Sequence, residues 1–253
     1  MVNIIRVRDQ KELINTAALR FTDAIVAAQN PGGGVHGDGV ARVVLTGGGA
    51  GIGLLRQLAD LDYAARRQGD QFPALSVDWS RVHVFFGDER NVPVDHPDSN
   101  EGQAREALLN HVGIPEANIH GYGLGALPME EAARAYAETL SEHAPHGFDL
   151  HLLGMGGEGH INSLFPHSAA TAEAERLVTV VNDSPKPPAE RLTLTLPAIR
   201  RAKRVWLLVS GAEKAEAAKH VADGSPAADW PASGAQGAEE TLLFLAEDAA
   251  ALL

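Results

Sequence analysis

The segment 148–166, which reads FDLHLLGMGGEGHINSLFP, constrains the fold of this chain more than any other stretch. It opens with a short apolar run that is typical of a buried strand, and Gly154 ends that run. Three more glycines follow, and Glu158 and His160 flank the last of them. Open α/β sheets bind ligands just beyond the carboxyl ends of their strands, so this loop is a candidate site. The alternative is a tight turn in which the histidine only caps or packs.

Predicted strands and helices alternate along the rest of the chain. Apolar runs predict further strands at 3–8, 42–45, 82–86, 177–181, 192–196, 205–209 and 242–245. Apolar residues at helical spacing predict helices at 9–29, 54–61, 104–112, 128–140 and 212–220. Such alternation indicates a mostly parallel sheet with helices on both faces. No internal repeat or long linker is visible, so we expect a single domain over residues 1–253.

A second glycine-rich loop follows the predicted strand at 42–45. It reads Thr46-Gly47-Gly48-Gly49-Ala50-Gly51-Ile52-Gly53, and leucines at helical spacing come after it. A strand, a glycine loop and a helix in this order offer backbone N–H groups to an anion. In this loop neither G-x-G-x-x-G nor G-x-x-x-x-G-K-[ST] matches, so a dinucleotide or nucleoside-triphosphate site here is poorly supported. A simple phosphate cradle and a plain strand-to-helix turn both remain open.

Charged residues follow the predicted strand at 82–86. Gly87-Asp88-Glu89-Arg90 comes directly after it, and His96-Pro97-Asp98-Ser99-Asn100 then precedes a predicted helix. Charged groups at the end of a strand are costly to bury, so these are either solvated in a turn or functional. Asp98, Ser99 and Asn100 predict a helix cap.

The composition limits the classes of function. The chain has no cysteine, which excludes disulfides, thiolate nucleophiles and cysteine-ligated metals. Its formal net charge of −12 disfavours nucleic acid as a partner, because nucleic acid needs a basic face. An anionic ligand would need a local cluster of positive groups. His143, His146 and His151 lie close in sequence, but neither an H-E-x-x-H pattern nor a suitable carboxylate spacing supports a metal site.

The first residues of the sequence give an expectation about location. The stretch MVNIIRVRDQKELINTA lacks the basic, apolar and small-residue regions of a secretory signal. No apolar run approaches the roughly 18 residues of a membrane span. We therefore expect a cytoplasmic protein that makes no contact with a membrane.

Four blocks of the sequence together resemble the 6-phosphogluconolactonase family and, more distantly, the glucosamine-6-phosphate deaminases. The blocks lie at residues 45–53, 85–100, 148–166 and 187–214, in the order of the family. GDERNVPVDHPDSN is similar to a D-E-R…H-P-D-S-N block, and LLGMGGEGHINSLFP is similar to an L-G-[MV]-G-x-D-G-H-x-x-S-L-F-P block. PPAERLTLTLPAI and SGAEKA resemble the late blocks.

The resemblance implies both a fold and a reaction. The fold is a three-layer α/β/α sandwich with a mostly parallel, Rossmann-like sheet. The reaction is hydrolysis of 6-phospho-D-glucono-1,5-lactone to 6-phosphogluconate in the pentose phosphate pathway. The resemblance implies no metal and no organic cofactor. The expected partner is the small sugar-phosphate lactone alone, and the expected assembly is a monomer or a small homo-oligomer.

The chemistry of the reaction gives roles to the residues in these blocks. Lactone hydrolysis needs a base to activate water, and histidine has a suitable pKa near neutrality. We expect His160 to be that base, with Asp88 or Glu158 to orient it. No G-x-S-x-G elbow occurs, so direct attack by water is simpler than a serine acyl-enzyme. The residues expected to hold the phosphate are Thr46, Gly47, Gly48, Gly49, Arg191 and Lys214. Arg90 either joins them or pairs with a local acid.

The sequence departs from the family pattern in two blocks. The first loop commonly reads S-G-G-S-T-P in the family, so phosphate binding here must rely on backbone N–H groups and Thr46. Glu158 replaces the usual aspartate, which moves the carboxylate about one methylene further out. Ile161 and Asn162 stand where threonine and alanine are common.

Two rival functions remain open. A glucosamine-6-phosphate deaminase-like enzyme shares the fold and the pairing of aspartate with histidine, although Arg90 and the run at 163–166 favour the lactonase. A non-catalytic sugar-phosphate sensor would keep Arg191 and Lys214 without needing catalytic residues. The presence of Asp88 together with His160 speaks against a sensor.

Overall fold

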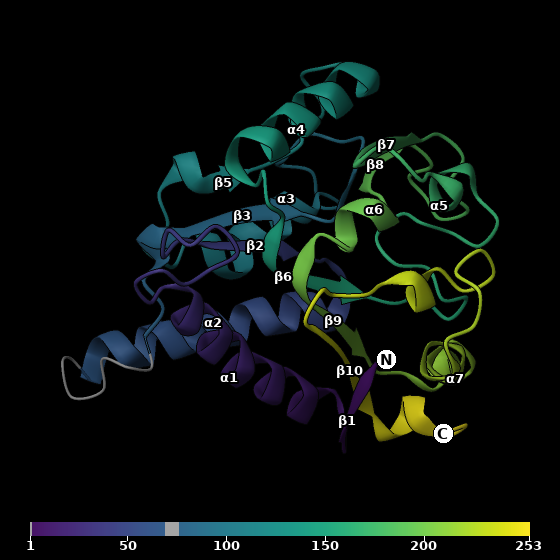
Figure 1. The fold of residues 1–253 in the computed structure, drawn as a ribbon, viewed down its shortest axis with the longest axis horizontal. Coiled ribbons are helices and arrows are strands. Elements are labelled where there is room, and N and C mark those ends of the chain that lie inside the picture. The colour runs from purple at the N-terminus through teal and green to yellow at the C-terminus, as the bar shows by residue number, and fades with distance from the viewer. Residues whose placement is uncertain (1, 69–75) are drawn as a thin grey trace.

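A seven-stranded parallel sheet forms the centre of the computed structural model, which describes residues 2–68 and 76–253 (Figure 1). Its strand order is β1-β10-β9-β6-β2-β3-β5. The strands are β1 (Asn3–Val7), β2 (Ala41–Leu45), β3 (Val82–Phe86), β5 (Ile119–His120), β6 (Phe148–Gly154), β9 (Ala202–Val209) and β10 (Glu240–Ala246). Every neighbouring pair in this sheet runs parallel, which confirms the sheet predicted from the alternation of elements.

Helices cover both faces of the sheet. The α-helices are α1 (Gln10–Ala28), α2 (Gly48–Gln68), α3 (Asn100–Ala104), α4 (Met129–His143), α5 (Ala169–Ala172), α6 (Leu196–Ile199) and α7 (Ala215–Asp223). Helices α1 and α2 lie against each other on one side of the sheet, and α4 and α6 lie on the other side (Figure 1). The predicted three-layer arrangement is confirmed. No helix in residues 2–68 and 76–253 is both long and apolar enough to cross a membrane.

A second, antiparallel sheet was not predicted. It has the order β4-β8-β7, with β4 (Asp88–Arg90), β8 (Arg191–Leu194) and β7 (Val178–Val181). The sequence left residues 87–90 open between a solvated turn and a functional segment and predicted a strand at 192–196, whereas the structure forms strands at 88–90 and 191–194. Residues 88–90 pair with a strand about a hundred positions away, which local sequence patterns do not reveal. Strand β8 stops at Leu194 because the Thr195 side chain accepts from the Ala198 N–H and caps α6.

The predicted glycine loop at 46–53 is shorter in the structure, because α2 begins at Gly48. Two of its glycines serve packing inside the helix. A Cβ atom on Gly51 would lie 2.6 Å from the Thr46 carbonyl oxygen, and one on Gly53 would lie 2.5 Å from Ile14 Cδ1. Of the glycines in this loop, Gly48 has a positive φ, of 79°, which turns the chain from β2 into the helix.

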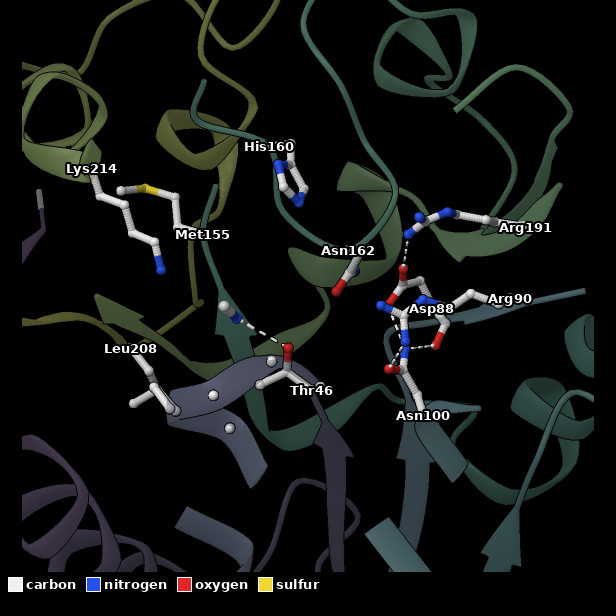
Figure 2. Close-up of a pocket in the computed structure, with 16 residues that line it drawn as sticks. Thr46, Asp88, Arg90, Asn100, Met155, His160, Asn162, Arg191, Leu208 and Lys214 are labelled. Carbon is white, nitrogen blue, oxygen red and sulfur yellow. Dashed lines mark hydrogen bonds and ion pairs between the residues drawn. The ribbon is translucent and has the colours of Figure 1, made fainter. Parts of the chain in front are cut away.

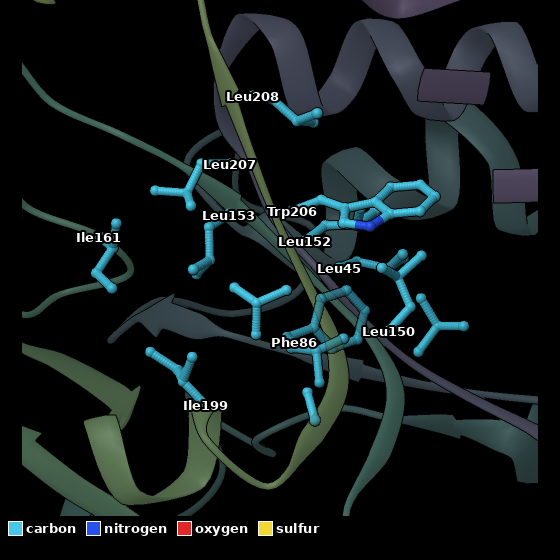
Figure 3. Close-up of a cluster of buried hydrophobic side chains, with 14 of the residues drawn as sticks. Leu45, Phe86, Leu150, Leu152, Leu153, Ile161, Ile199, Trp206, Leu207 and Leu208 are labelled. Atoms are coloured by element: carbon cyan, nitrogen blue, oxygen red, sulfur yellow. The ribbon is translucent and has the colours of Figure 1, made fainter. Parts of the chain in front are cut away.

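The strands that lead to the candidate site are buried in the hydrophobic core. Leu152, Leu153, Trp206 and Leu207 of the adjacent strands β6 and β9 are almost completely buried. Figure 3 shows these side chains gathered with Ile161 from the loop that follows β6. Burial of a large apolar side chain contributes about 1.5–3 kcal/mol. The loop that carries His160 therefore follows a firmly packed strand. The residue directly after His160, Ile161, is buried in the core again.

Candidate functional site

A polar pocket lies at the carboxyl ends of β2, β6 and β9, beside the small antiparallel sheet (Figure 2). Its volume of about 160 Å³ is below the roughly 300–1,000 Å³ of pockets for drug-sized ligands, so it fits one compact molecule. The residues that line it are Thr46, Gly47, Gly48, Gly49, Ala50, Gly51, Asp88, Arg90, Asn100, Gly154, Met155, His160, Asn162, Arg191, Leu208 and Lys214. The structure thus brings together every predicted site residue except Glu158, which contacts His160.

The loop after β6 holds His160 through close backbone packing. The Gly156 N–H donates to the carbonyl oxygen of His160 at 3.0 Å. A Cβ atom on Gly156 would lie only 2.0 Å from His160 Nδ1, so no larger residue fits without moving the ring. The imidazole stacks on Phe165 with ring centroids 4.7 Å apart and keeps 18% of its side chain exposed. The ring is therefore fixed in place and still open to the pocket.

His160 lies between an acid and a base. Its Nδ1 atom is 3.1 Å from Glu158 Oε1, and Lys186 Nζ lies 3.0 Å from the same oxygen and 3.3 Å from the same ring nitrogen. Burial and then the Lys186 charge lower the pKa of His160, and Glu158 opposes this shift. The imidazole is thus neutral near pH 7. Nε2 makes no hydrogen bond with the described residues, so it is the ring nitrogen that remains for a ligand.

Glu158 is ionised at neutral pH. Its partial burial would raise its pKa, but its own backbone N–H, Lys186 and His160 outweigh that effect and lower the pKa of Glu158 to about 2. Asp88, the other acid that the sequence offered as an orienting group, forms no hydrogen bond with His160 within the described part of the chain. The contact with Nδ1 comes from Glu158.

Asp88 is buried and held on both of its oxygens. Its Oδ2 atom accepts from Ser163 Oγ at 2.6 Å, and its Oδ1 atom accepts from Asn100 Nδ2 at 3.0 Å. Arg191 Nη1 stands 3.8 Å from Oδ2. The carboxylate thus has a fixed direction at the edge of the pocket, which the solvated-turn reading did not predict.

The sequence predicted that Asp98, Ser99 and Asn100 together cap a helix, but in the structure Ser99 and Asn100 have different roles. Only Ser99 caps α3, because its Oγ atom accepts from the Gly102 N–H. The Asn100 side chain instead links Asp88 to Arg90, whose Nη1 donates to Asn100 Oδ1 at 2.6 Å and to the Asp98 carbonyl at 2.9 Å. The alternative that Arg90 pairs with a local acid is not seen in the described residues, where it makes no ion pair.

Arg191 is only 4% exposed and supports the turn before its own strand. Its Nε atom donates to the Pro188 carbonyl at 3.0 Å, and its Nη2 atom donates to the Lys186 carbonyl at 2.9 Å. The antiparallel register sets it opposite Arg90. Its Nη1 atom makes no hydrogen bond with the described residues, so this part of the guanidinium is available to a ligand in the pocket.

The other positive groups lie near Thr46 and α7. Thr46 Oγ1 accepts from the Gly154 N–H at 3.0 Å, which ties the ends of β2 and β6 together and leaves the hydroxyl hydrogen free to donate. Helix α2 begins beside it and presents its positive N-terminal end. Lys214 ends the 3₁₀ turn Ala212–Lys214 directly before α7, and it has no acidic partner in residues 2–68 and 76–253. Figure 2 shows Lys214, His160 and Arg191 around the pocket, with Thr46 at its base.

Asn162 is a pocket residue to which the sequence analysis gave no role. Its side chain is 9% exposed, and both of its amide atoms are buried without a hydrogen-bond partner among the described residues. Its φ is 49°, and a Cβ atom on Gly87 would lie 2.3 Å from its Oδ1. An unpaired buried amide costs about 1–3 kcal/mol, so the arrangement favours a ligand that supplies the missing bonds. The tolerance of asparagine for positive φ was the available signal.

Comparison with known proteins decides the family. Residues 8–244 match the family model described as Glucosamine-6-phosphate isomerases/6-phosphogluconolactonase. The chain belongs to this family. The 6-phosphogluconolactonase of Mycobacterium leprae is 47% identical to it over 252 residues, which cover 96% of this chain and 95% of the relative. This confirms the resemblance found in the four sequence blocks.

Solved structures of this family show the same fold. The 6-phosphogluconolactonase of Thermotoga maritima matches with a TM-score of 0.80 at 27% identity, covering 98% of this chain and 100% of that one. A monomeric glucosamine-6-phosphate deaminase matches with a TM-score of 0.80 at 25% identity, covering 100% of both chains. Both activities therefore occur on this architecture, and the fold alone does not choose between them.

Proposed function

We propose that this protein hydrolyses 6-phospho-D-glucono-1,5-lactone to 6-phosphogluconate, a step of the pentose phosphate pathway. The observation that carries the proposal is His160, held by Glu158 with Nε2 free, in a pocket that also contains Arg191 and Lys214. A neutral imidazole can activate water for attack on the uncharged ester of a lactone. The positive groups can bind the phosphate of the same substrate. The names of relatives such as the one from Mycobacterium leprae support the same substrate.

The proposed first step is addition of water to the lactone carbonyl. His160 Nε2 takes a proton from a water molecule as the water oxygen bonds to C1, while Glu158 stabilises the imidazolium that forms. Negative charge develops on the carbonyl oxygen. Asn162 brings an unpaired amide to the pocket, and its Nδ2 group is the proposed partner of this oxyanion.

The second step opens the ring. The bond from C1 to the ring oxygen breaks, and His160 returns its proton to that oxygen, which becomes the hydroxyl group on C5. Atoms and charge balance without a covalent enzyme intermediate. Asp88, whose two oxygens are fixed by Ser163 and Asn100, is proposed to position sugar hydroxyl groups rather than to transfer the proton.

The phosphate is assigned to the positive part of the pocket. Lys214, Arg191 and the first N–H groups of α2, including those of Gly48 and Gly49, are the proposed partners. Thr46 contributes its hydroxyl hydrogen. Arg90 is proposed to fix Asn100 and Asp88, because its Nη1 atom is already bonded to Asn100 and to the Asp98 carbonyl.

The test is acid release from freshly prepared 6-phosphogluconolactone, followed with and without the protein. The matched control is His160→Gln, which keeps a similar polar volume but has no basic nitrogen. We expect rapid hydrolysis with the wild type and a rate near the spontaneous one with the variant. Equal rates for wild type, variant and buffer would contradict the proposed reaction.

The deaminase is the second candidate, because a deaminase structure matches as well as a lactonase structure does. A coupled assay of ammonia release from glucosamine 6-phosphate separates the two. We expect no ammonia above background. Binding of phosphosugars without turnover of either substrate would instead indicate a sensor.

A further inference from the structure

Three histidine side chains meet at a second place in the molecule, outside the pocket. His83 is the second residue of β3, His120 ends β5, and His143 ends α4. The central sheet thus supplies two imidazoles, from β3 and its edge strand β5, and the end of a helix supplies the third. None of the three lines the pocket around His160, so the reaction proposed above does not use them.

Their ring nitrogens are spaced as ligands of one metal ion would be. One nitrogen from each ring lies within 4.8 Å of the other two, and His83 Nδ1 is 2.9 Å from His120 Nε2. Three imidazoles on a tetrahedral Zn²⁺, with Zn–N bonds of about 2.0–2.1 Å, have nitrogens about 3.3 Å apart. The ring centroids stand 5.1, 5.6 and 4.4 Å apart, so small ring rotations would reach this arrangement.

The three rings have few other bonds to lose. The hydrogen bond between His83 and His120 is the only one that their ring nitrogens make within the described residues. The His143 ring makes none there. His120 is 7% exposed and stacks on Phe85, with ring centroids 4.6 Å apart, which fixes one ligand firmly. His83 and His143 are partly exposed and leave a path for an ion from solvent.

Nearby charges are already balanced. Arg42 is a cation next to the cluster, and its Nε atom donates to the His143 carbonyl at 2.7 Å, which holds the end of α4. Asp38 accepts from Arg42 Nη1 at 3.0 Å and from Nη2 at 2.8 Å, so the guanidinium charge is neutralised locally. The exposed Glu142 carboxylate lies 3.8 Å from His143 Nε2 and adds negative charge next to the cluster.

We propose that His83, His120 and His143 form a binding site for one divalent transition-metal ion, with Zn²⁺ as the best match. Imidazole ligands suit Zn²⁺, and a set of three protein ligands leaves a fourth position for water. The ion would tie β5 to β3 and to α4. Strand β5 is a two-residue edge strand that pairs with β3 only through Ile119 and His120, so a metal there would strengthen a weak edge.

These three histidines differ from the group that was considered as metal ligands from the sequence and found to lack a supporting pattern. His143, His146 and His151 do not form a common cluster in the described residues. His151 is completely buried in β6 and both of its ring nitrogens lack a partner among the described residues, and the His146 ring lies tilted against His36. Only His143 belongs to the proposed site.

The experiment is calorimetric titration of chelator-treated protein with Zn²⁺, using the wild type and three variants. His83→Gln removes one ligand at a partly exposed position. His146→Gln is the matched control, because this histidine is nearby in sequence but outside the cluster. His160→Gln removes the imidazole of the pocket, which is the other place where the ion could bind.

We expect one Zn²⁺ per chain for the wild type, His146→Gln and His160→Gln, and at least tenfold weaker binding for His83→Gln. Zn²⁺ should also raise the melting temperature of the wild type but not that of His83→Gln. His120→Gln should match His83→Gln if it folds. Absence of stoichiometric binding to the wild type, or binding that is lost in His160→Gln and kept in His83→Gln, would overturn the proposal.

Discussion

At the scale of single residues, His160 lies next to an acid and a base that shift its pKa in opposite directions. Glu158 contacts Nδ1 at 3.1 Å, and Lys186 approaches the same atom at 3.3 Å. In the proposed mechanism the ionised carboxylate favours the proton on Nδ1, which leaves Nε2 basic, whereas burial and the Lys186 charge lower the pKa of the ring. The arrangement gives the proposed base both an orientation and a suitable protonation state at neutral pH.

His160→Gln should fold normally and lose about 10²–10⁴-fold in kcat, because loss of a general base typically has this effect. The measurement is lactone turnover together with a thermal melt of both proteins. Since the ring stacks only on Phe165 and is partly exposed, we expect a small change in melting temperature. A kcat within a few-fold of the wild type would show that His160 is not the base.

The pH profile should respond to Lys186 and Glu158 with opposite signs. The Lys186 charge lowers the pKa of His160, so Lys186→Met should raise that pKa and move the acid limb of kcat/KM to higher pH. Glu158 raises the pKa of His160, so Glu158→Gln should move the limb to lower pH. Glu158→Gln should also reduce kcat, because the ring loses its orienting carboxylate. Acid limbs that coincide in all three proteins would mean that another group sets the profile.

At the scale of elements, the short loop after β6 depends on a glycine for a steric reason. A methyl group on Gly156 would meet His160 Nδ1 at 2.0 Å. Gly156→Ala should therefore displace the imidazole and reduce kcat by about 10²-fold, the size of effect that a 1 Å misplacement can have. Gly113→Ala is the matched control, since a Cβ there meets nothing within 4 Å. Equal turnover of the two variants would show that the loop adjusts freely.

The strand β8 and the 3₁₀ turn before α7 each supply one of the proposed phosphate ligands, but they differ in structural importance. Arg191 donates to three backbone carbonyls of the turn before β8, whereas the Lys214 side chain has no hydrogen bond or ion pair within the described residues. We expect Arg191→Ala and Lys214→Ala both to raise KM for the phosphorylated lactone. Only Arg191→Ala should also lower the free energy of unfolding, by roughly 1–3 kcal/mol, because the turn loses its donor and the buried Asp88 carboxylate loses a nearby cation.

Kinetics and chemical denaturation of the two variants check this difference. Turnover of unphosphorylated gluconolactone, where it is measurable, should change little in Lys214→Ala. An unchanged KM for the phosphorylated substrate in Lys214→Ala would place the phosphate away from this residue.

At the scale of the whole molecule, a protein of net charge −12 has to concentrate positive charge where it binds an anion. The parallel sheet does this by bringing the ends of β2, β6 and β9 to one edge, where α2 also begins. Inorganic phosphate should therefore raise the melting temperature of the wild type. Saturation at about 100 times Kd would contribute about 2.7 kcal/mol.

Added neutral salt should weaken this protection, because screening reduces charge attraction at an open pocket. Lys214→Ala should be protected less than the wild type at the same phosphate concentration. Identical protection of the two proteins would locate the bound anion elsewhere on the molecule.

Local patterns were enough to predict the parallel sheet and its long helices. The buried stripe of α1 and the apolar runs of β2, β3 and β6 lie where periodicity placed them, since these patterns reflect contact with a single core. Local patterns missed the two-residue β5 and the strand β4, because short strands depend on pairing with distant partners. They also missed the early start of α2, because glycine disfavours helices and only tight packing around Thr46 and Ile14 explains it.

The sequence by itself determined the family, the order of the elements and the identity of the candidate site residues, because motifs and periodicity are properties of neighbouring positions. Only the tertiary structure decided which groups touch. It placed Glu158 and Lys186 on His160, directed Asp88 toward Ser163 and Asn100, and left the Asn162 amide unpaired in the pocket. Such contacts join residues far apart in the chain, so their distances and directions exist only after the strands have assembled.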